Sequence, residues 1–335
     1  MRQWQFGQSN GSENLELTDV TAPQPGPGQV LVRIRAASLN YRDTLLVKVA
    51  DGYTPGRVPL SDGAGDVIGV GAGVSRWSIG DRVAGTFFQD WISGRFEMRY
   101  HQAALGGTVD GALREEAVFP EHSLVRVPSH YSHEEAATMP CAGVTAWYSL
   151  ILRCGFQPGD SVLLIGTGGV SVWGLQIAAA SGGRPIVVSS SQEKLLKARQ
   201  LGAAETISSA ATPDWDREVF RLTSRRGVDH VLEVGGPGTL KRSLSSVAAG
   251  GKIAQIGVLT GFGPSDASLF PLLTKNATMS GIYVGHRDAF EQLVRFVEQT
   301  QLRPVIDRVF LFEEAPAAFQ YLASGRHFGK VVIRV

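Results

Sequence analysis

The chain has 335 residues, which is more than one hydrophobic core usually serves, so two domains are expected. Hydrophobic residues make up 43% and charged residues 19%, the composition of a folded globular protein rather than a disordered one. The formal net charge of +1 provides no basic excess for nucleic acid or for an acidic membrane surface, so neither partner is expected.

The cysteines and the apolar stretches indicate a cytoplasmic protein. Two cysteines, Cys141 and Cys154, cannot build a disulfide framework, and they fit a reducing compartment. No apolar run approaches the length of a membrane span, and the first residues lack the apolar stretch of a signal peptide.

Residues 1–135 are expected to form a small, twisted β-barrel. Short apolar stretches such as Val30–Ala36 end at turns rich in glycine or proline. The segment Ala22–Gly28 has three prolines and two glycines, so it is neither a helix nor a central strand. The texture changes at Ser132, which with Glu135 reads as a capping box that opens a helical stretch to about Leu152.

From Asp160 the chain alternates between strands and helices. The predicted strands are Ser161–Gly166, Arg184–Ser190, Ala204–Ser208, His230–Val234 and Lys252–Val258, and the predicted helices lie near residues 170–181, 191–201, 214–224 and 239–248. Nearly continuous apolar strands are typical of a parallel sheet covered by helices on both faces. A sixth strand, Met279–Val284, gives the count of a doubly wound nucleotide-binding sheet.

The last part of the chain is predicted to return to the first domain. It contains two helices, about Asp288–Gln301 and Glu313–Ser324, and a closing strand, Lys330–Val335. The predicted domains are therefore residues 1–135 completed by 286–335, and residues 136–285.

A glycine turn after the first of these strands is the main functional signal. It consists of Gly166, Thr167, Gly168, Gly169 and Val170, and it opens a helix. Such a turn brings backbone amides and the positive end of a helix dipole to the pyrophosphate of a dinucleotide. The sixth position, usually glycine or alanine, is Ser171, which is still small. The sequence therefore predicts an oxidoreductase that binds a nicotinamide dinucleotide.

The end of the second strand indicates which dinucleotide. An NAD site usually has a carboxylate there, whereas this chain has Ser189, Ser190 and Ser191, followed by Lys194. Hydroxyls and an ammonium group can donate to a 2′-phosphate, so NADPH is favoured over NADH. In the alternative interpretation Ser191 caps the next helix and Lys194 lies in its exposed first turns, and the two interpretations are compatible.

Several segments together resemble the medium-chain dehydrogenase/reductase superfamily, and most of all its zinc-independent, quinone-oxidoreductase-like branch. The segments are the glycine turn, Ala37–Asp43, Gly80–Val83, Glu193–Ala203, Val228–Gly235 and Ser324–Lys330. The resemblance implies a GroES-like β-barrel domain and a Rossmann domain with a six-stranded parallel sheet, with the active site in the cleft between them.

The resemblance also bears on zinc. The family's three catalytic zinc ligands fall on Asn40, Ser61 and Cys141, and only the last keeps its type. One thiolate cannot replace three protein ligands, so no zinc is expected. Cys141 is then expected to be a small core residue or a neighbour of the nicotinamide.

The family's other site residues are carried over by position. The resemblance implies hydrogen-bond donors at Asn40, Tyr41 and Tyr53, with Tyr53 more a rim residue than a proton donor, and a supporting carboxylate at Asp43. Cofactor contacts are implied for Thr145, Gly257, Val258, Leu259, Tyr283 and Lys330. The absence of a tyrosine after Ile207 weakens the preference for NADPH.

Without a metal, negative charge on the substrate oxygen must be stabilised by hydrogen bonds alone. An apolar, carbonyl-conjugated substrate is therefore expected, an enone or a quinone, in which the incoming charge delocalises. The alternatives are a zinc-free NAD(P)-dependent alcohol dehydrogenase or aldehyde reductase, and a non-catalytic nucleotide-binding protein. The aromatic segment Thr86–Tyr100 either walls a substrate pocket or covers the barrel. A homodimer is expected through the edge strand that ends Leu269–Val284, with Met279, Ile282 and Val284 apolar.

Overall fold

The computed structural model describes residues 1–8, 14–47 and 55–335, which form two compact units. The first unit contains Met1–Val144 and Gly285–Val335, and the second contains Thr145–Val284. The sequence predicted the boundary between the two domains at residues 135 and 136. In the structure it comes later, because the start of the helical stretch, α2 (His133–Ala137), packs on strands of the first unit.

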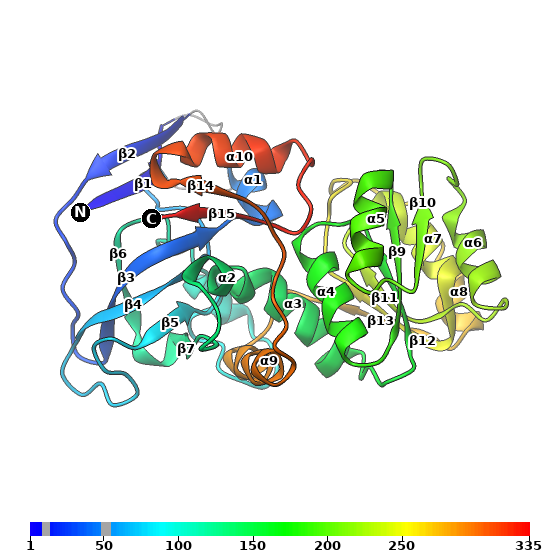
Figure 1. Cartoon of the computed structure of the whole chain (residues 1–335), viewed down its shortest axis with the longest axis horizontal. Coiled ribbons are helices and arrows are strands. Elements are labelled where there is room, and N and C mark those ends of the chain that lie inside the picture. The colour runs from blue at the N-terminus through cyan, green and yellow to red at the C-terminus, as the bar shows by residue number, and fades with distance from the viewer. Residues whose placement is uncertain (9–13, 48–54) are drawn as a thin grey trace. The chain divides into compact units, whose positions relative to one another are not determined.

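The first unit contains a two-stranded and a seven-stranded sheet (Figure 1). The small sheet consists of β1 (Arg2–Phe6) and β2 (Leu15–Asp19). The large sheet consists of β3 (Gln29–Ser38), β4 (Asp62–Val70), β5 (Arg82–Gly85), β6 (Glu116–Pro120), β7 (Leu124–Arg126), β14 (Ile306–Leu311) and β15 (Lys330–Arg334). The long strand β3 pairs antiparallel with β4, β6 and β15, so residues from both ends of the chain meet along it.

The helices of the first unit are short, apart from two near the end of the chain. They are α1 (Tyr41–Leu46), α2, α9 (Arg287–Thr300) and α10 (Ala315–Ala323), with 3-10 turns at Met98–Ala103, Glu121–Ser123 and Phe312–Glu314. The capping box at Ser132 is confirmed: its hydroxyl accepts from the Glu135 amide at 3.2 Å, and its own amide donates to that carboxylate at 2.8 Å.

The helical stretch after Ser132 is not one continuous helix, as the sequence suggested. It divides into α2, a π-turn at Met139–Gly143, α3 (Val144–Trp147) and a second π-turn at Tyr148–Arg153. Pro140 lies at the start of the first π-turn. Proline has no amide hydrogen and crowds the preceding turn, which explains the break.

The aromatic segment of the first unit packs mainly on itself. Phe87, Phe88 and Trp91 are at most 2% exposed. The Phe88 ring contacts those of Trp91 and Phe96 edge-on or tilted, with centroids 6.1 and 5.4 Å apart, and Trp91 stacks on Tyr100. Of the two interpretations offered for this segment, these contacts favour a covering layer with its own core.

The second unit is a six-stranded parallel sheet, as predicted (Figure 1). Its strands are β8 (Ser161–Ile165), β9 (Arg184–Ser189), β10 (Glu205–Ser208), β11 (Val228–Glu233), β12 (Val247–Gln255) and β13 (Thr278–Gly281). Its helices are α4 (Gly169–Ala180), α5 (Gln192–Gln200), α6 (Trp215–Leu222), α7 (Pro237–Ser246) and α8 (Phe270–Thr274). The strand order β10-β9-β8-β11-β12-β13 is that of a doubly wound fold with β8 as its first strand.

The sixth strand is shorter than predicted. It ends at Gly281 rather than Val284, because Gly281 pairs with Gln255, the last residue of β12, and the chain beyond it reaches a left-handed residue at Val284, with a φ of +59°. Ile282 and Val284 are 7% and 5% exposed, so they belong to the interior and are not an apolar edge. Met279 is partly exposed on the strand itself.

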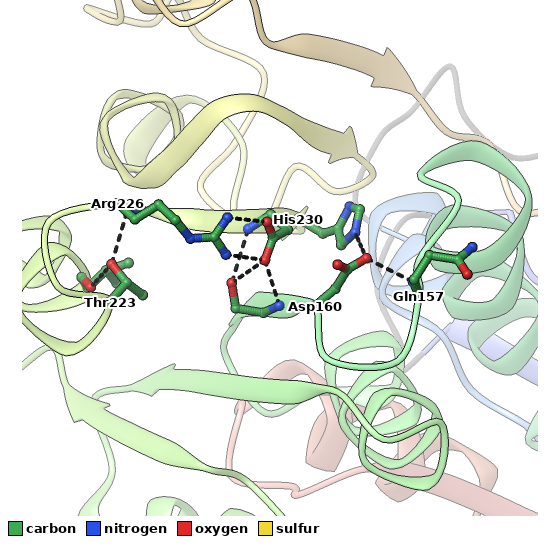
Figure 2. Close-up of polar contacts among 9 residues, drawn as sticks. Gln157, Asp160, Thr223, Arg226 and His230 are labelled. Atoms are coloured by element: carbon green, nitrogen blue, oxygen red, sulfur yellow. Dashed lines mark hydrogen bonds and ion pairs between the residues drawn. The ribbon is translucent and has the colours of Figure 1, made fainter.

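A polar network joins the amino-terminal ends of β8 and β11 (Figure 2). The Asp229 carboxylate accepts from the Ser161 amide at 2.8 Å and hydroxyl at 2.7 Å, and from both terminal nitrogens of Arg226 at 2.7 and 2.6 Å. Beside it, the buried His230 ring lies 2.9 Å from the Asp160 carboxylate. The network fixes the edge formed by the amino-terminal ends of the strands. In such folds ligands bind at the opposite edge, where the strands have their carboxyl-terminal ends.

None of the helices in the described part of the chain is long and apolar enough to cross a membrane.

Candidate functional site

The glycine turn has the geometry that phosphate binding requires. Gly166, directly after β8, has a φ of +76°, which disfavours residues with a side chain, and its amide donates to the Val188 carbonyl at 2.7 Å. Gly168 is the extended N-cap residue of the 12-residue helix α4. Because glycine has no side chain to cap them, the first amides of α4 are available to an anion.

Ser171, the departure from the usual glycine pattern, fits this turn. Its side chain is 3% exposed, and its hydroxyl donates to the Ile165 carbonyl at 2.7 Å. The serine therefore ties α4 to the end of β8 in place of the closer packing that glycine or alanine would give. The residues present fit a dinucleotide whose pyrophosphate would be held by the amides of residues 166–170.

The serines after β9 have more than one role. Ser191 is the N-cap of α5, and its hydroxyl accepts from the Lys194 amide at 3.4 Å, so the capping interpretation is confirmed. The Ser191 amide donates to the buried Ser189 hydroxyl at 3.3 Å, whereas Ser190 is exposed. The nearby Glu193 forms an ion pair with Lys197 at 2.8 Å.

A buried carboxylate that the sequence did not single out shapes the next loop. Glu233, at the end of β11, is fully buried and accepts from the amides of Gly235 at 2.6 Å and Gly236 at 3.0 Å. The Thr239 hydroxyl donates to the same carboxylate at 2.6 Å, and the Ser243 hydroxyl also donates to it. All four donors converge on one side chain, so Glu233 fixes the turn that leads into α7.

The loop after β12 lies against this turn. A Cβ atom on Gly257 would come within 2.1 Å of the Val234 carbonyl oxygen, so the close approach requires glycine. Val258 is partly exposed, while Leu259 and Tyr283 are 47% and 46% exposed. Thr145, the first residue of the second unit, is 2% exposed.

A second group of predicted residues meets at three strand ends of the first unit. Strand β15 runs antiparallel to β3 with Val332 opposite Ser38, and extending that register by two residues brings Lys330 opposite Asn40. On the other side of β3, Ser38 lies opposite Asp62 of β4. The end of β3 therefore lies between the starts of β4 and β15.

Around these strand ends lies a cluster, called here the Asn40 cluster, made of the buried Asn40, Ser61, Asp62 and Lys330 and the partly exposed Cys141, whose amide donates to Asp62 at 3.3 Å. The Lys330 ammonium donates to the Leu39 carbonyl at 2.6 Å and to Asn40 Oδ1 at 2.5 Å, and lies 3.7 Å from Asp62 Oδ2. The Ser61 hydroxyl donates to Asp62 Oδ1 at 2.7 Å, and Asn40 Nδ2 lies 3.5 Å from Ser61 Oγ.

Backbone strain helps to place Ser61. The preceding residue, Leu60, is buried and has a φ of +70°, a conformation that costs a branched residue about 1 kcal/mol or more. Gly111 and Gly106 permit this, because a Cβ on either would come within 2.1 or 2.6 Å of the Leu60 backbone.

Asp43 supports the cluster through the backbone. Its carboxylate accepts from the Asn40 amide at 2.7 Å, and its other oxygen, Asp43 Oδ1, is buried and has no hydrogen-bond partner among the described residues. Complete burial raises the pKa of Asp43 to about 6, against the opposing effects of Arg42 and the Asn40 amide. Burial also raises the pKa of Asp62, while Lys330 and neighbouring hydrogen bonds act in the opposite direction.

Two tyrosines were also predicted as hydrogen-bond donors of the site. Tyr41 is the first residue of α1 and is 38% exposed. Tyr53 lies outside the described residues.

The Asn40 cluster does not fit a zinc ion. Asn40, Ser61 and Cys141 supply an amide, a hydroxyl and a thiol, and desolvation raises the pKa of the Cys141 thiol far above its usual value. Zinc binds thiolates, imidazoles and carboxylates, and the ammonium group of Lys330 is already the cation among these side chains. Within residues 1–8, 14–47 and 55–335, no three or more His, Cys, Asp or Glu side chains are grouped to hold a metal.

Comparisons with known proteins agree with this architecture. The family model for the alcohol dehydrogenase GroES-like domain matches residues 26–129, and that for zinc-binding dehydrogenases matches residues 169–299. A zinc-type alcohol dehydrogenase-like protein of Schizosaccharomyces pombe is 41% identical, covering 97% of this chain and 96% of the relative. A quinone oxidoreductase of Pseudomonas aeruginosa is 30% identical over 98% of both chains.

A solved structure is similar over the whole chain. The crystal structure of an NAD-dependent alcohol dehydrogenase superposes with a TM-score of 0.90 at 33% identity, and all of both chains is covered. The resemblance to the medium-chain dehydrogenase/reductase superfamily is thereby confirmed, and the chain belongs to that superfamily.

Proposed function

We propose that this oxidoreductase uses NADPH, without zinc, to reduce an activated C=C bond or a quinone. The observation that carries the proposal is the Asn40 cluster, which has a lysine ammonium among the positions of the family's zinc ligands. Such a cluster offers hydrogen-bond donors but no Lewis acid, which favours substrates whose negative charge delocalises.

The second unit supplies the cofactor groups. The amides of Gly166–Val170 would hold the pyrophosphate, and Ser189, Ser190 and Lys194 would donate to a 2′-phosphate. When bound, the reduced nicotinamide supplies a hydride. The likeness to an NAD-dependent alcohol dehydrogenase supports the opposite cofactor preference, so both nucleotides belong in the test.

In the first unit Asn40 would donate a hydrogen bond to the substrate oxygen. Charge that reaches that oxygen would be stabilised by the Asn40 amide, with Ser61 and Asp62 completing the hydrogen-bond chain behind it. Water would supply the proton that completes the reduction. The likeness to a quinone oxidoreductase supports this substrate class.

A zinc-free alcohol dehydrogenase is the second candidate, favoured by the two alcohol dehydrogenase-type relatives. A nucleotide-binding protein without turnover is the third. Oxidation of NADPH and of NADH, measured with matched quinones, enones and aldehydes, distinguishes the three. We expect turnover with quinones or enones, faster with NADPH, and unchanged after treatment with a zinc chelator. Preference for aldehydes would support the second candidate, and NADPH binding without turnover of any acceptor would refute catalysis.

A further inference from the structure

We propose that Lys330 is a positioning residue whose ammonium group fixes the side-chain amide of Asn40 as a hydrogen-bond donor toward the substrate. The proposal rests on the proposed function, because it assigns a role within the same site. It differs from the role that family resemblance gives to Lys330, which is contact with the cofactor.

Asn40 is slightly more exposed than Lys330, so a ligand would reach Asn40 first, with Lys330 behind it. Asn40 is 8% exposed, whereas Lys330 is 3% exposed and Asp62 and Ser61 are completely buried. The Lys330 ammonium has three hydrogens, and two of them are donated to the Leu39 carbonyl and Asn40 Oδ1. The nearest carboxylate oxygen, on Asp62, is 3.7 Å away. A cofactor phosphate would therefore have to reach the third hydrogen of an ammonium group that is 3% exposed and already faces a carboxylate.

The chemistry of the pair fixes the direction of the amide. An ammonium group only donates, so the Asn40 carbonyl oxygen must face Lys330 and the NH₂ group must lie on the other side. There Asn40 Nδ2 lies 3.5 Å from the Ser61 hydroxyl, whose own proton is donated to Asp62. The ammonium group and the Ser61 hydroxyl therefore hold the amide from its two ends, and the contact to the ammonium group is the shorter and charge-assisted one. Its loss makes it easier for the amide to turn by half a rotation, which would present its oxygen where a donor is needed.

The backbone around Lys330 is fixed by Val305 and by the preceding Gly329. Its amide donates to the Val305 carbonyl at 3.0 Å, and the preceding Gly329 has a φ of +84°. A Cβ on Gly329 would lie 2.5 Å from the same carbonyl oxygen, so the turn into β15 requires glycine. The backbone of Lys330 is therefore set before its side chain crosses to Asn40.

The main test uses a charge-balanced variant. Lys330→Met alone leaves Asp62 buried without its cation, so it is expected to lower stability and could fail to fold. The double variant K330M/D62N removes both charges and is expected to regain most of that stability. Asp62→Asn alone keeps the ammonium group on Asn40, so it is the reference for any effect of Asp62 itself. If Lys330 positions Asn40, K330M/D62N loses about 100-fold in kcat relative to D62N, as expected for the loss of one aligned donor, with the KM for NADPH changed less than about twofold.

Three comparisons make the result specific. Asn40→Ala should lower kcat by a similar factor, and adding it to K330M/D62N should cause little further loss, because Lys330 acts through Asn40. Lys252→Met is the matched control, since that lysine also donates to a backbone carbonyl, that of Cys154, but lies in the second unit. A raised KM for NADPH with an unchanged kcat would overturn the proposal in favour of cofactor contact.

A structural readout keeps the inference separate from the proposed function. In a crystal structure of K330M/D62N, the Asn40 amide should be turned or disordered, and its side-chain NH₂ signals in a ¹⁵N spectrum should shift. An unchanged amide orientation would overturn the inference, whatever the activity. If none of the quinones or enones supports NADPH oxidation by the wild-type protein, the proposed function fails. The crystal structure and the ¹⁵N spectrum then decide alone whether Lys330 orients Asn40.

Discussion

Replacing Asp43 by Asn should change how the stability of the protein depends on pH. The carboxylate is completely buried, one of its oxygens has no hydrogen-bond partner in the part of the chain that the structure describes, and its pKa is raised from 3.8 to about 6. In the unfolded chain the same group loses its proton near its ordinary pKa. The folded protein therefore binds more protons than the unfolded chain between these two values, and its stability falls as the pH rises through this window.

The shift of about two pKa units corresponds to roughly 3 kcal/mol, at about 1.4 kcal/mol per unit. Below the lower value both states are protonated and the carboxyl group carries no penalty. Above about pH 6 the wild-type protein bears the whole penalty of a buried charge, with Arg42, Lys330 and Asp62 as its charged neighbours. Asparagine cannot ionise, so the variant bears none of it.

The assay is urea unfolding of the two proteins over about pH 4 to pH 7. The difference in unfolding free energy should move by roughly 3 kcal/mol in favour of Asp43→Asn as the pH rises, while any constant effect of the altered hydrogen bond cancels. Asp19→Asn, at the exposed end of β2, controls for the loss of a surface carboxylate. A difference that stays flat across this range would refute the reasoning about Asp43.

Further predictions concern the second unit. Gly166→Ala should cost about 1 kcal/mol of stability because of its φ of +76°, but should weaken NADPH binding more strongly, as measured by calorimetry; equal binding would contradict the assigned phosphate turn. Glu233→Gln should lower stability by about 1–3 kcal/mol, since a glutamine that keeps its oxygen toward Gly235, Gly236 and Thr239 turns its NH₂ group to Ser243, whose hydroxyl now donates to the carboxylate, and an unchanged Tm would show that the network is dispensable. The ion pair with Arg226 and the hydrogen bonds from Ser161 lower the pKa of Asp229. The Asp229 carboxylate should therefore stabilise the fold above the ordinary pKa of aspartate, and this contribution should be lost as the pH falls below it. Asp229→Asn should remove this pH dependence of the unfolding free energy, as measured by urea unfolding. Light scattering should give twice the 35.9 kDa of one chain, as the predicted homodimer requires, and a mass of one chain would exclude it.

The order of strands and helices in the second unit could be predicted from the sequence, because most of its signals are local. The strands β8 and β9 are short apolar runs, and the turns carry their own chemistry, as at Gly166 and Ser191. The fifth strand was predicted at Lys252–Val258 but lies at Val247–Gln255, and the short helix α8 was not predicted. The sixth strand was predicted too long because Ile282 and Val284 are as apolar as strand residues, whereas the pairing ends at Gly281, opposite Gln255, where β12 ends. Glu233 was missed because its four donors follow it in the chain but converge only when α7 has formed.

The Asn40 cluster could be predicted only in part. Asn40 and Asp43 are three residues apart, and their backbone contact is a local one. Lys330 and Asn40 are 290 residues apart, and they meet because of the register between β3 and β15, which no local pattern specifies. Asp62 was not predicted as a site residue, since an aspartate in a glycine-rich segment gives no sign that it will be completely buried.

The pairing of β15 with β3 also orders events during synthesis of the chain. The second unit, Thr145–Val284, is complete well before Lys330 emerges from the ribosome, so the dinucleotide domain can fold while the cluster still lacks its cation. Until then Asp62 and Asp43 would be two carboxylates without the lysine that balances them, and the end of β3 would remain an open edge. Docking of the last strand therefore completes the sheet and the charge balance of the reactive cluster in one step, so a chain arrested before residue 330 could hold a nucleotide but lack an assembled Asn40 cluster.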